Sequence, residues 1–419
     1  MDASNCRIIF HVDVNSAYLS WTAAKMLQYG ECDEDIRRIP SVIGGSIEDR
    51  HGIILAKSIP AKKFNIQTGE PIIGAMKKCP DLKVFPPDYG LYIKCSNMMY
   101  ELLCEYSPLI QRYSIDEVFM EMSHVKDRAM NVANEIKYRI EKELGFTVNI
   151  GIGNNKLLAK MASDFPKKNS IHTLFSDEIK EKMWPLPVND LFMVGKATAG
   201  KLKKLNVETI GELAQYDLDI LISIFKSFGM LLHNYANGID NSEVRSKNYL
   251  EIKGIGNSIT WNHDIKSKEE ACRILLSLVE TSATRLRKAD KMCGVVVVSL
   301  KTNSFLYFSH QKTLSYMTDS TEEIYLNIKQ VFEEIWHGEP LRQLGIRLTK
   351  LSSNEFYQPN LLDQNKIYKQ RALDKAIDEI RGKFGKGSII RSTFINSQVK
   401  PLNGGVGDEE DYPMMGSIL

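Results

Sequence analysis

The sequence predicts an α+β protein built from several domains, and three observations lead to this class. The chain has 419 residues, which is too long for one core of ordinary size. Strand-like and helix-like stretches alternate in two separate regions, 7–175 and 250–353. A mainly helical stretch at 176–240 lies between them. We therefore expect two sheets packed against helices, with a helical domain between them.

Composition restricts the possible partners. Hydrophobic residues make up 43% of the chain and charged residues 25%, as in soluble globular proteins. The formal net charge is only +2, so binding to nucleic acid would depend on local basic clusters. The seven cysteines include no Cys-x-x-Cys pair, which favours reduced thiols and the cytoplasm over disulfides or a zinc site. The most apolar run, at 294–300, is too short to span a bilayer, so we expect no membrane partner.

The first region opens with a strand, "RIIFHVDV" at 7–14, and a helical pattern from Ala17 to about Tyr29. Short pieces broken by "GGS" and "TGEP" follow between Pro40 and Pro80, which indicates a small inserted subdomain. A helix after "PPDYG" leads to a strand at 112–122. A helix at about 126–144, the strand "FTVNIGIG" and the helix "NKLLAKMASDF" then complete a β-α-β arrangement.

The second region reads as a separate small domain with two β-α-β units. Its order is strand, helix (269–289), strands (292–302 and 305–309), helix (321–337) and strand (342–351). Beyond it we expect a loop, a helix at about 368–384, and an acidic, glycine-containing tail that is loosely ordered.

Three acids, Asp13, Asp116 and Glu117, fall within otherwise apolar strands. A lone buried carboxylate costs several kcal/mol, roughly, so each acid needs a basic partner or a cation. Pairing with Lys or Arg is the ordinary explanation for any one of them, but three acids together favour Mg²⁺. Asp116 and Glu117 reach one ion only at a hairpin end or bend. Such a site suits two Mg²⁺ ions about 3.5 to 4 Å apart.

Three motifs carry a resemblance to a known family. "FHVDVNSAYLSW", "YSIDEVFMEM" and "GIGNNKLLAKMASDFPKKN" resemble the palm motifs of the Y-family DNA polymerases, the translesion enzymes of the bacterial DinB/UmuC kind. They occur in the family's order, and the resemblance extends over roughly 7–353. It implies a right-hand polymerase: a palm with a mixed sheet (1–30 and 80–172), small fingers (31–79), a helix-hairpin-helix thumb (173–245), a β-α-β little finger (250–353), and a C-terminal clamp-binding loop, helix and flexible tail (354–419).

The resemblance also implies an activity, which is template-directed, low-fidelity DNA synthesis across lesions without proofreading. Asp13 and Asp116 would bridge two Mg²⁺ ions, and Glu117 would hold the ion at the primer 3′-hydroxyl. The main-chain carbonyl of Val14 would complete the site. Primer–template DNA and deoxynucleoside triphosphates would be the substrates, and we expect a monomer.

Several residues would contact the nucleotide. The N-terminus of the first helix, formed by Asn15, Ser16, Ala17 and Tyr18, would receive phosphates. Tyr18 matches the family's steric gate against a ribose 2′-hydroxyl, with an ordinary core tyrosine as the less favoured alternative, and Tyr92 matches an aromatic beside the gate. Lys62 and Lys167 match basic residues on the triphosphate, although isolated lysines are usually only solvated. Many relatives have Tyr and Arg where this chain has Ile59 and Lys62, which leaves the triphosphate contacts open.

Other segments resemble binding elements of the family. Gly195, Lys196 and Lys201 would bind the DNA backbone in the helix-hairpin-helix; a helix with a solvated lysine face is the alternative. "YQPNLLD" at 357–363 resembles the peptide that docks on the sliding clamp, through Gln358, Leu361 and Leu362, but such short patterns also arise by chance. The basic side chains of the following helix could touch DNA or simply be solvated: Arg371, Lys375, Arg381 and Lys383.

Two other functions remain open. A nucleotide cyclase could use a similar palm with paired acids, but it would not need lysine-rich hairpins or a little finger. A non-catalytic relative could bind damaged DNA or the clamp. Retention of Asp13, Asp116 and Glu117 argues against that second alternative, because uncompensated acids facing phosphates would weaken binding.

Overall fold

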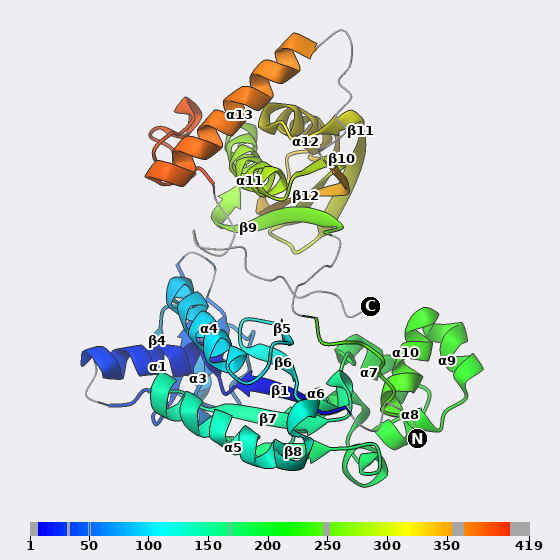
Figure 1. Cartoon of the computed structure of the whole chain (residues 1–419). Helices are drawn as coiled ribbons and strands as arrows, with labels where there is room; N and C mark the ends of the chain where they lie inside the picture. The colour runs from blue at the N-terminus through cyan, green and yellow to red at the C-terminus, as the bar shows by residue number, and fades with distance from the viewer. Residues whose placement is uncertain are drawn as a thin grey trace. The chain divides into compact units, whose positions relative to one another are not determined.

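The computed structural model describes residues 7–31, 34–48, 50, 52–166, 169–245, 252–353 and 364–402. The described residues divide into two compact units. The first holds those between 7 and 44 and between 54 and 245, and the second holds those between 45 and 53 and between 252 and 402. Each unit is described separately below (Figure 1). Every helix of the described residues is too short or too polar to cross a membrane.

A five-stranded mixed sheet organises the first unit. Its order is β5-β6-β1-β7-β8, so the first strand of the chain lies at the centre. β1 is antiparallel to both neighbours, whereas β7 and β8 are parallel. The strands are β1 (Ile9–Val14), β5 (Ile110–Arg112), β6 (Glu117–Glu121), β7 (Val148–Gly153) and β8 (Ile171–Leu174).

The two faces of β1 contact different helices, because successive side chains of a strand point to opposite sides. Phe10, Val12 and Val14 face the main core, to which α1 (Ala17–Tyr29), α4 (Tyr89–Cys104) and α5 (Ala129–Arg139) contribute. Ile9 packs on the other side against α6 (Lys156–Ser163). A Cβ at Gly151 of β7 would lie 2.0 Å from the carbonyl oxygen of Ala159. The glycine therefore permits the close approach of α6 to the sheet.

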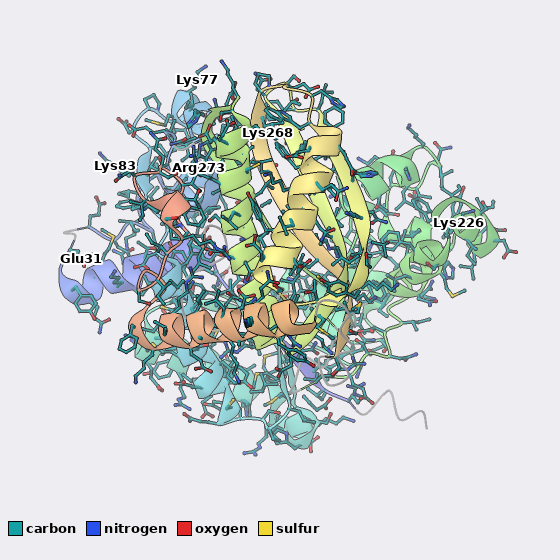
Figure 2. The ribbon with its side chains drawn as sticks, turned by 90° about the horizontal axis from the view of Figure 1, so that it is seen from above. Glu31, Lys77, Lys83, Lys226, Lys268 and Arg273 are labelled. Atoms are coloured by element: carbon teal, nitrogen blue, oxygen red, sulfur yellow. The ribbon has the colours of Figure 1, made fainter. Side chains whose placement is uncertain are left out.

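A three-stranded sheet, in the order β3-β2-β4, forms the inserted subdomain. It contains β2 (Ser41–Gly44), β3 (Ile54–Lys57) and β4 (Lys83–Phe85), with the helices α2 (Ile59–Lys62) and α3 (Ile72–Lys78). Val42, Ile54 and Ile72 lie in its small core. Figure 2 labels two of its basic side chains, Lys77 at the end of α3 and Lys83 on β4.

Helices follow the first sheet, as predicted for 176–240. They are α7 (Lys196–Lys203), α8 (Ile210–Ala214), α9 (Leu218–Phe225) and α10 (Ser227–Ala236). Leu202, Ile210 and Leu232 belong to their shared core. Shorter irregular helices in this unit are η2 (Ser123–Arg128), η3 (Ile140–Leu144), η4 (Ile179–Met183) and η5 (Val188–Asp190).

The second unit is a four-stranded antiparallel sheet with the order β11-β10-β12-β9. Its strands are β9 (Gly254–Ile265), β10 (Lys291–Thr302), β11 (Tyr307–Thr318) and β12 (Leu341–Ser353). The helices α11 (Lys268–Lys288) and α12 (Thr321–Ile335) cover one face (Figure 1). The predicted order of elements is confirmed. The expected strand at 305–309 is wrong in its bounds, because 305 and 306 lie between the turn and the strand, and β11 runs from Tyr307 to Thr318.

The segment after the second sheet also belongs to this unit. α13 (Gln364–Phe384) lies on the helical layer through ion pairs, with Arg287 Nε of α11 2.6 Å from Asp378 and Arg371 Nε 2.8 Å from Asp319. Phe394, in η6 (Ser392–Phe394), and Val399 are buried in the core. The expectation of a loosely ordered tail is therefore wrong for 385–402.

Candidate active site

The three predicted acids lie at neighbouring strand ends in the first unit. Asp13 and Glu117 are directly paired across β1 and β6, so their side chains share the face that carries α6. Asp116 precedes β6 in the turn from β5, and its carbonyl accepts a hydrogen bond from the Val14 N–H at 3.0 Å. The acids therefore stand at a hairpin end, the one place where both Asp116 and Glu117 can be near Asp13.

A cavity of about 750 Å³ opens at these strand ends. The β1–α1 junction, the β5–β6 turn and the inserted subdomain all contribute to its wall. Its lining includes Asp13, Val14, Asn15, Ser16, Ala17, Tyr18, Lys57, Lys62, Ser114, Asp116 and Asp164, but Glu117 is not among the lining residues. The sequence thus brings two of the three acids and the expected nucleotide-binding turn to one cavity.

Glu117 is held by two basic groups that the sequence analysis did not predict. Lys160 Nζ of α6 lies 3.2 Å from Glu117 Oε1, and His11 Nε2 lies 3.5 Å from Oε2. Burial would raise the pKa of Glu117, but the contacts with His11 and Lys160 lower it to about 2. Burial also lowers the pKa of His11, which keeps the imidazole neutral, so Lys160 supplies the compensating charge.

The ionised forms of Asp13 and Asp116 are poorly compensated within the protein. Burial, together with the neighbouring acids, raises the pKa of Asp13 to about 8 despite Lys160. Burial raises the pKa of Asp116 as well, although Ser114 Oγ donates a hydrogen bond to it at 2.5 Å. Partly desolvated carboxylates that share a cavity fit a hard divalent cation, which prefers oxygen ligands.

The side chains of Asp13, Asp116 and Glu117 do not converge on one point as a complete metal site would require. Within the described part of the chain, no group of three or more His, Cys, Asp or Glu side chains is placed to hold one ion. The physical reason is the pairing of Glu117 with Lys160, which turns the third carboxylate towards α6. Oxygen donors from Asp13 and Asp116 remain on the cavity wall.

Stacked aromatic rings form the wall beside the acids. The rings of Tyr18 and Tyr92 are parallel to within 6°, with centroids 4.4 Å apart, and Tyr89 meets Tyr18 edge-on. Tyr92 is fully buried, and its hydroxyl lies 3.2 Å from Thr22 Oγ1. Burial raises the pKa of Tyr18 to about 12. Tyr18 is therefore fixed by packing while its side chain still reaches the cavity.

Two lysines of the inserted subdomain line the same cavity. Lys62 is the last residue of α2 and is exposed. Lys57, which the sequence analysis did not single out, ends β3, and its Nζ donates to the carbonyl of Ile66 at 2.6 Å. Ile59 is 54% exposed. Four predicted site residues lie outside the described residues: Lys167, Gln358, Leu361 and Leu362.

The predicted DNA-binding residues are on the surface. Gly195 caps α7 with an ordinary φ of −82°, and a Cβ there would meet nothing within 4 Å. Neither backbone conformation nor local packing requires a glycine at this position. Lys196 is exposed, and Lys201 Nζ lies 5.9 Å from the centre of the Phe225 ring.

The sequence left open whether the four basic residues of α13 contact DNA or are solvated. Two of them instead form ion pairs within the second unit. Arg371 pairs with Asp319, and Arg381 lies 3.5 Å from the buried Glu280. Both guanidinium groups therefore stabilise the position of α13, and the interpretation of these two as solvated or DNA-contacting is wrong.

Comparisons with known proteins establish the family. Residues 12–164 match the impB/mucB/samB family, 252–361 match its C-terminal domain, and 176–207 match the IMS family HHH motif. DNA polymerase IV of Clostridium acetobutylicum is 48% identical over 396 residues, which cover 94% of this chain and 100% of that protein. The chain belongs to the impB/mucB/samB family.

Two further comparisons support the same family and fold. DNA polymerase IV of Acetivibrio thermocellus is 34% identical over 400 residues, covering 94% of this chain and 98% of that protein. A solved Y-family DNA polymerase chimera matches with a TM-score of 0.70 at 19% identity, over 83% of this chain and 100% of the chimera. The predicted right-hand polymerase fold, with palm, thumb and little finger, is confirmed.

The predicted resemblance is confirmed as well: this impB/mucB/samB member is a Y-family polymerase of the bacterial DinB type. Membership makes it a translesion DNA polymerase that uses DNA and nucleotide substrates and depends on a divalent metal. These relatives do not favour the cyclase or the non-catalytic alternative.

Replacing Asp13 by Asn should stabilise the metal-free protein at pH 8 by about 1–3 kcal/mol and have little effect near pH 4. The raised pKa means that the folded protein binds the Asp13 proton more tightly than the unfolded chain does. The stabilisation by this proton is complete below the pKa of Asp13 in the unfolded chain and is lost as the pH rises through about 8. Thermal unfolding at both pH values measures this. A gain of equal size at both would show that the charge is not responsible.

Proposed function

We propose that the cavity joins a deoxynucleoside triphosphate to a primer 3′-hydroxyl with two Mg²⁺ ions. The observation that supports this most is the meeting of Asp13, Asp116 and the rigid Tyr18 in one cavity. Bound Mg²⁺ would supply charge for the departing pyrophosphate and lower the pKa of the 3′-hydroxyl. Asp13, Asp116 and the Val14 carbonyl would hold the ions, and Glu117 would join them by exchanging part of its contact with Lys160.

Residues around the acids would orient the nucleotide. Asn15 to Tyr18 run from the end of β1 into the first turn of α1 and line the cavity. The Asn15 N–H donates to the Thr147 carbonyl at 3.0 Å, so phosphate would be received by the main-chain N–H groups at the start of α1. Lys62 enters the same cavity from the inserted subdomain, which we assign as fingers. Lys167, which lies outside the described residues, would join it on the triphosphate. Tyr18, backed by Tyr92, would exclude a 2′-hydroxyl.

The second unit would grip DNA without reading its sequence. The outer face of its sheet, away from α11 and α12, carries small, polar and basic side chains, among them Ser299, Lys301, Gln311 and Arg347. Phosphate contacts from such a face carry no sequence information. We further propose a monomer that works in the cytoplasm. Its fidelity would be low because small fingers would enclose the nascent pair loosely, and the described part of the chain contains no proofreading domain.

Asp116→Ala should abolish primer extension in the presence of Mg²⁺ and the four deoxynucleotides, with a loss of at least about 1,000-fold, because a cation ligand is removed. Asp127→Ala, an exposed acid of the same unit, should extend primers normally. Thermal unfolding checks that both variants fold. Extension by Asp116→Ala at the native rate would remove this residue from the site, and product without primer or template would favour the cyclase alternative.

Tyr18→Ala should raise ribonucleotide incorporation at least about tenfold relative to deoxynucleotides, because the ring that fills the 2′ position is lost. Tyr89→Ala is the matched control, since it removes a ring from the same aromatic cluster. Competition between the two sugars in single-turnover extension measures the effect. Unchanged discrimination in Tyr18→Ala, or an equal change in both variants, would exclude Tyr18 as the gate.

Changing Gln358 and Leu361 together to Ala should weaken binding to a purified sliding clamp at least about tenfold, because a pocket-filling anchor is lost. Distributive primer extension without clamp should remain at the native level. Surface plasmon resonance and extension assays measure the two effects. Equal clamp affinity of both proteins would show that 357–363 is not the docking peptide.

A further inference from the structure

The hairpin between β10 and β11 exposes four consecutive apolar side chains. Phe305, Leu306, Tyr307 and Phe308 are 61%, 59%, 65% and 45% exposed. Single exposed apolar residues are normal on a protein surface, but a run of four at a loop tip is not. The run therefore indicates a ligand that covers it.

The hairpin tip is rigidly built. Thr302 and Leu306 close the turn, with the Thr302 N–H donating to the Leu306 carbonyl at 2.9 Å and the Leu306 N–H donating to Thr302 Oγ1 at 3.1 Å. Phe305 adopts a φ of 66°, a conformation that glycine or asparagine would hold more easily. Phe305 therefore occupies a backbone conformation that favours a smaller residue.

Two cations lie against the same tip. Lys301 Nζ is 4.9 Å from the centre of the Phe305 ring, and Arg342 Cζ is 5.2 Å from it. Such contacts hold positive charge beside the exposed rings. A ligand that covers the tip would therefore combine flat apolar surfaces with negative charge.

Tyr307 connects the tip to the outer face of the sheet. It pairs with Lys301 across β10 and β11, and Lys301 pairs with Gln343 of β12, so the three side chains lie on one face. The positions further along that face include no acid: Val295, Val297, Ser299, Ser309, Gln311, Thr313, Gly345, Arg347 and Thr349. Asp264, at the end of β9, accepts a hydrogen bond from Asn303 of the hairpin at 3.1 Å, but its charge is paired with Arg50 at 2.6 Å.

We propose that the hairpin 302–308 is a stacking platform for unpaired DNA bases, with Phe305 and Tyr307 as the rings and Lys301 and Arg342 as phosphate contacts. Phe308 is not part of the platform, because it pairs with the buried Leu300 on the opposite face of the sheet. Aromatic rings beside cations are the arrangement by which proteins bind single-stranded nucleic acid without sequence preference. Bases of an intact duplex are already stacked on each other, so the platform would bind the single-stranded part of a primer–template. The proposal builds on the DNA-binding role of the second unit, but it does not require catalysis.

Fluorescence anisotropy with the full chain tests the platform without Mg²⁺ or nucleotide, so it does not depend on the proposed chemistry. The probes are single-stranded oligodeoxythymidylate and a blunt duplex of equal length. The double variant Phe305→Ala, Tyr307→Ala should bind the single strand about tenfold more weakly, as expected for lost base stacking, and the duplex equally well. Tyr307→Trp should keep native single-strand affinity. Tyr368→Ala, an exposed tyrosine of α13, is the matched control and should change neither.

A charge variant gives an independent check. Lys301→Gln should reduce the dependence of single-strand binding on salt by about one phosphate contact. Equal weakening on both DNAs in the double variant would overturn the proposal, because it would indicate a duplex contact or a lost fold. Unchanged single-strand affinity would also overturn it, and weaker binding to a purified sliding clamp in that case would identify a protein-docking surface instead.

Discussion

The pairing of β1 with β6 is the constraint on which the site depends, because it puts Asp13 directly opposite Glu117. Like charges at directly opposed positions destabilise a sheet. The structure offsets this repulsion with Lys160, whose ammonium group lies 3.2 Å from Glu117 and comes from α6. That helix can approach so closely only because Gly151 and Gly153 lack side chains where it crosses the sheet.

One lysine cannot compensate three ionised carboxylates, so the ionised forms of Asp13 and Asp116 are only partly compensated where they line the cavity. The raised pKa of Asp13, caused first by its burial, shows that its ionised form is poorly compensated in the protein alone. Poorly compensated carboxylates of this kind are typical of functional sites, where a ligand completes the electrostatics. The aromatic cluster of Tyr18, Tyr92 and Tyr89 keeps the adjoining wall rigid.

Much of the fold and the position of the acids could be predicted, because these features are recorded in local sequence patterns. Apolar runs gave the strands, and helical spacing gave α1 and α11. The adjacent acids Asp116 and Glu117 required a hairpin end, and the structure has one there. The partners of Glu117 could not be found this way. His11 and Lys160 are far apart in sequence, and only the packing of α6 on β1 brings them together.

The position of α13 escaped prediction for a different reason. Hydrophobic periodicity identifies the buried face of a helix only when that face is apolar. On α13 the face that packs on the second unit is ionic: Asp374 and Arg381 are buried, while Leu373 and Phe384 are 60% and 67% exposed. The charges on α13 are matched by Arg287, Asp319 and Glu280 of the unit itself. These ion pairs join residues that are distant in sequence. The hydrophobic pattern of α13 alone therefore does not identify the face that packs on the rest of the unit.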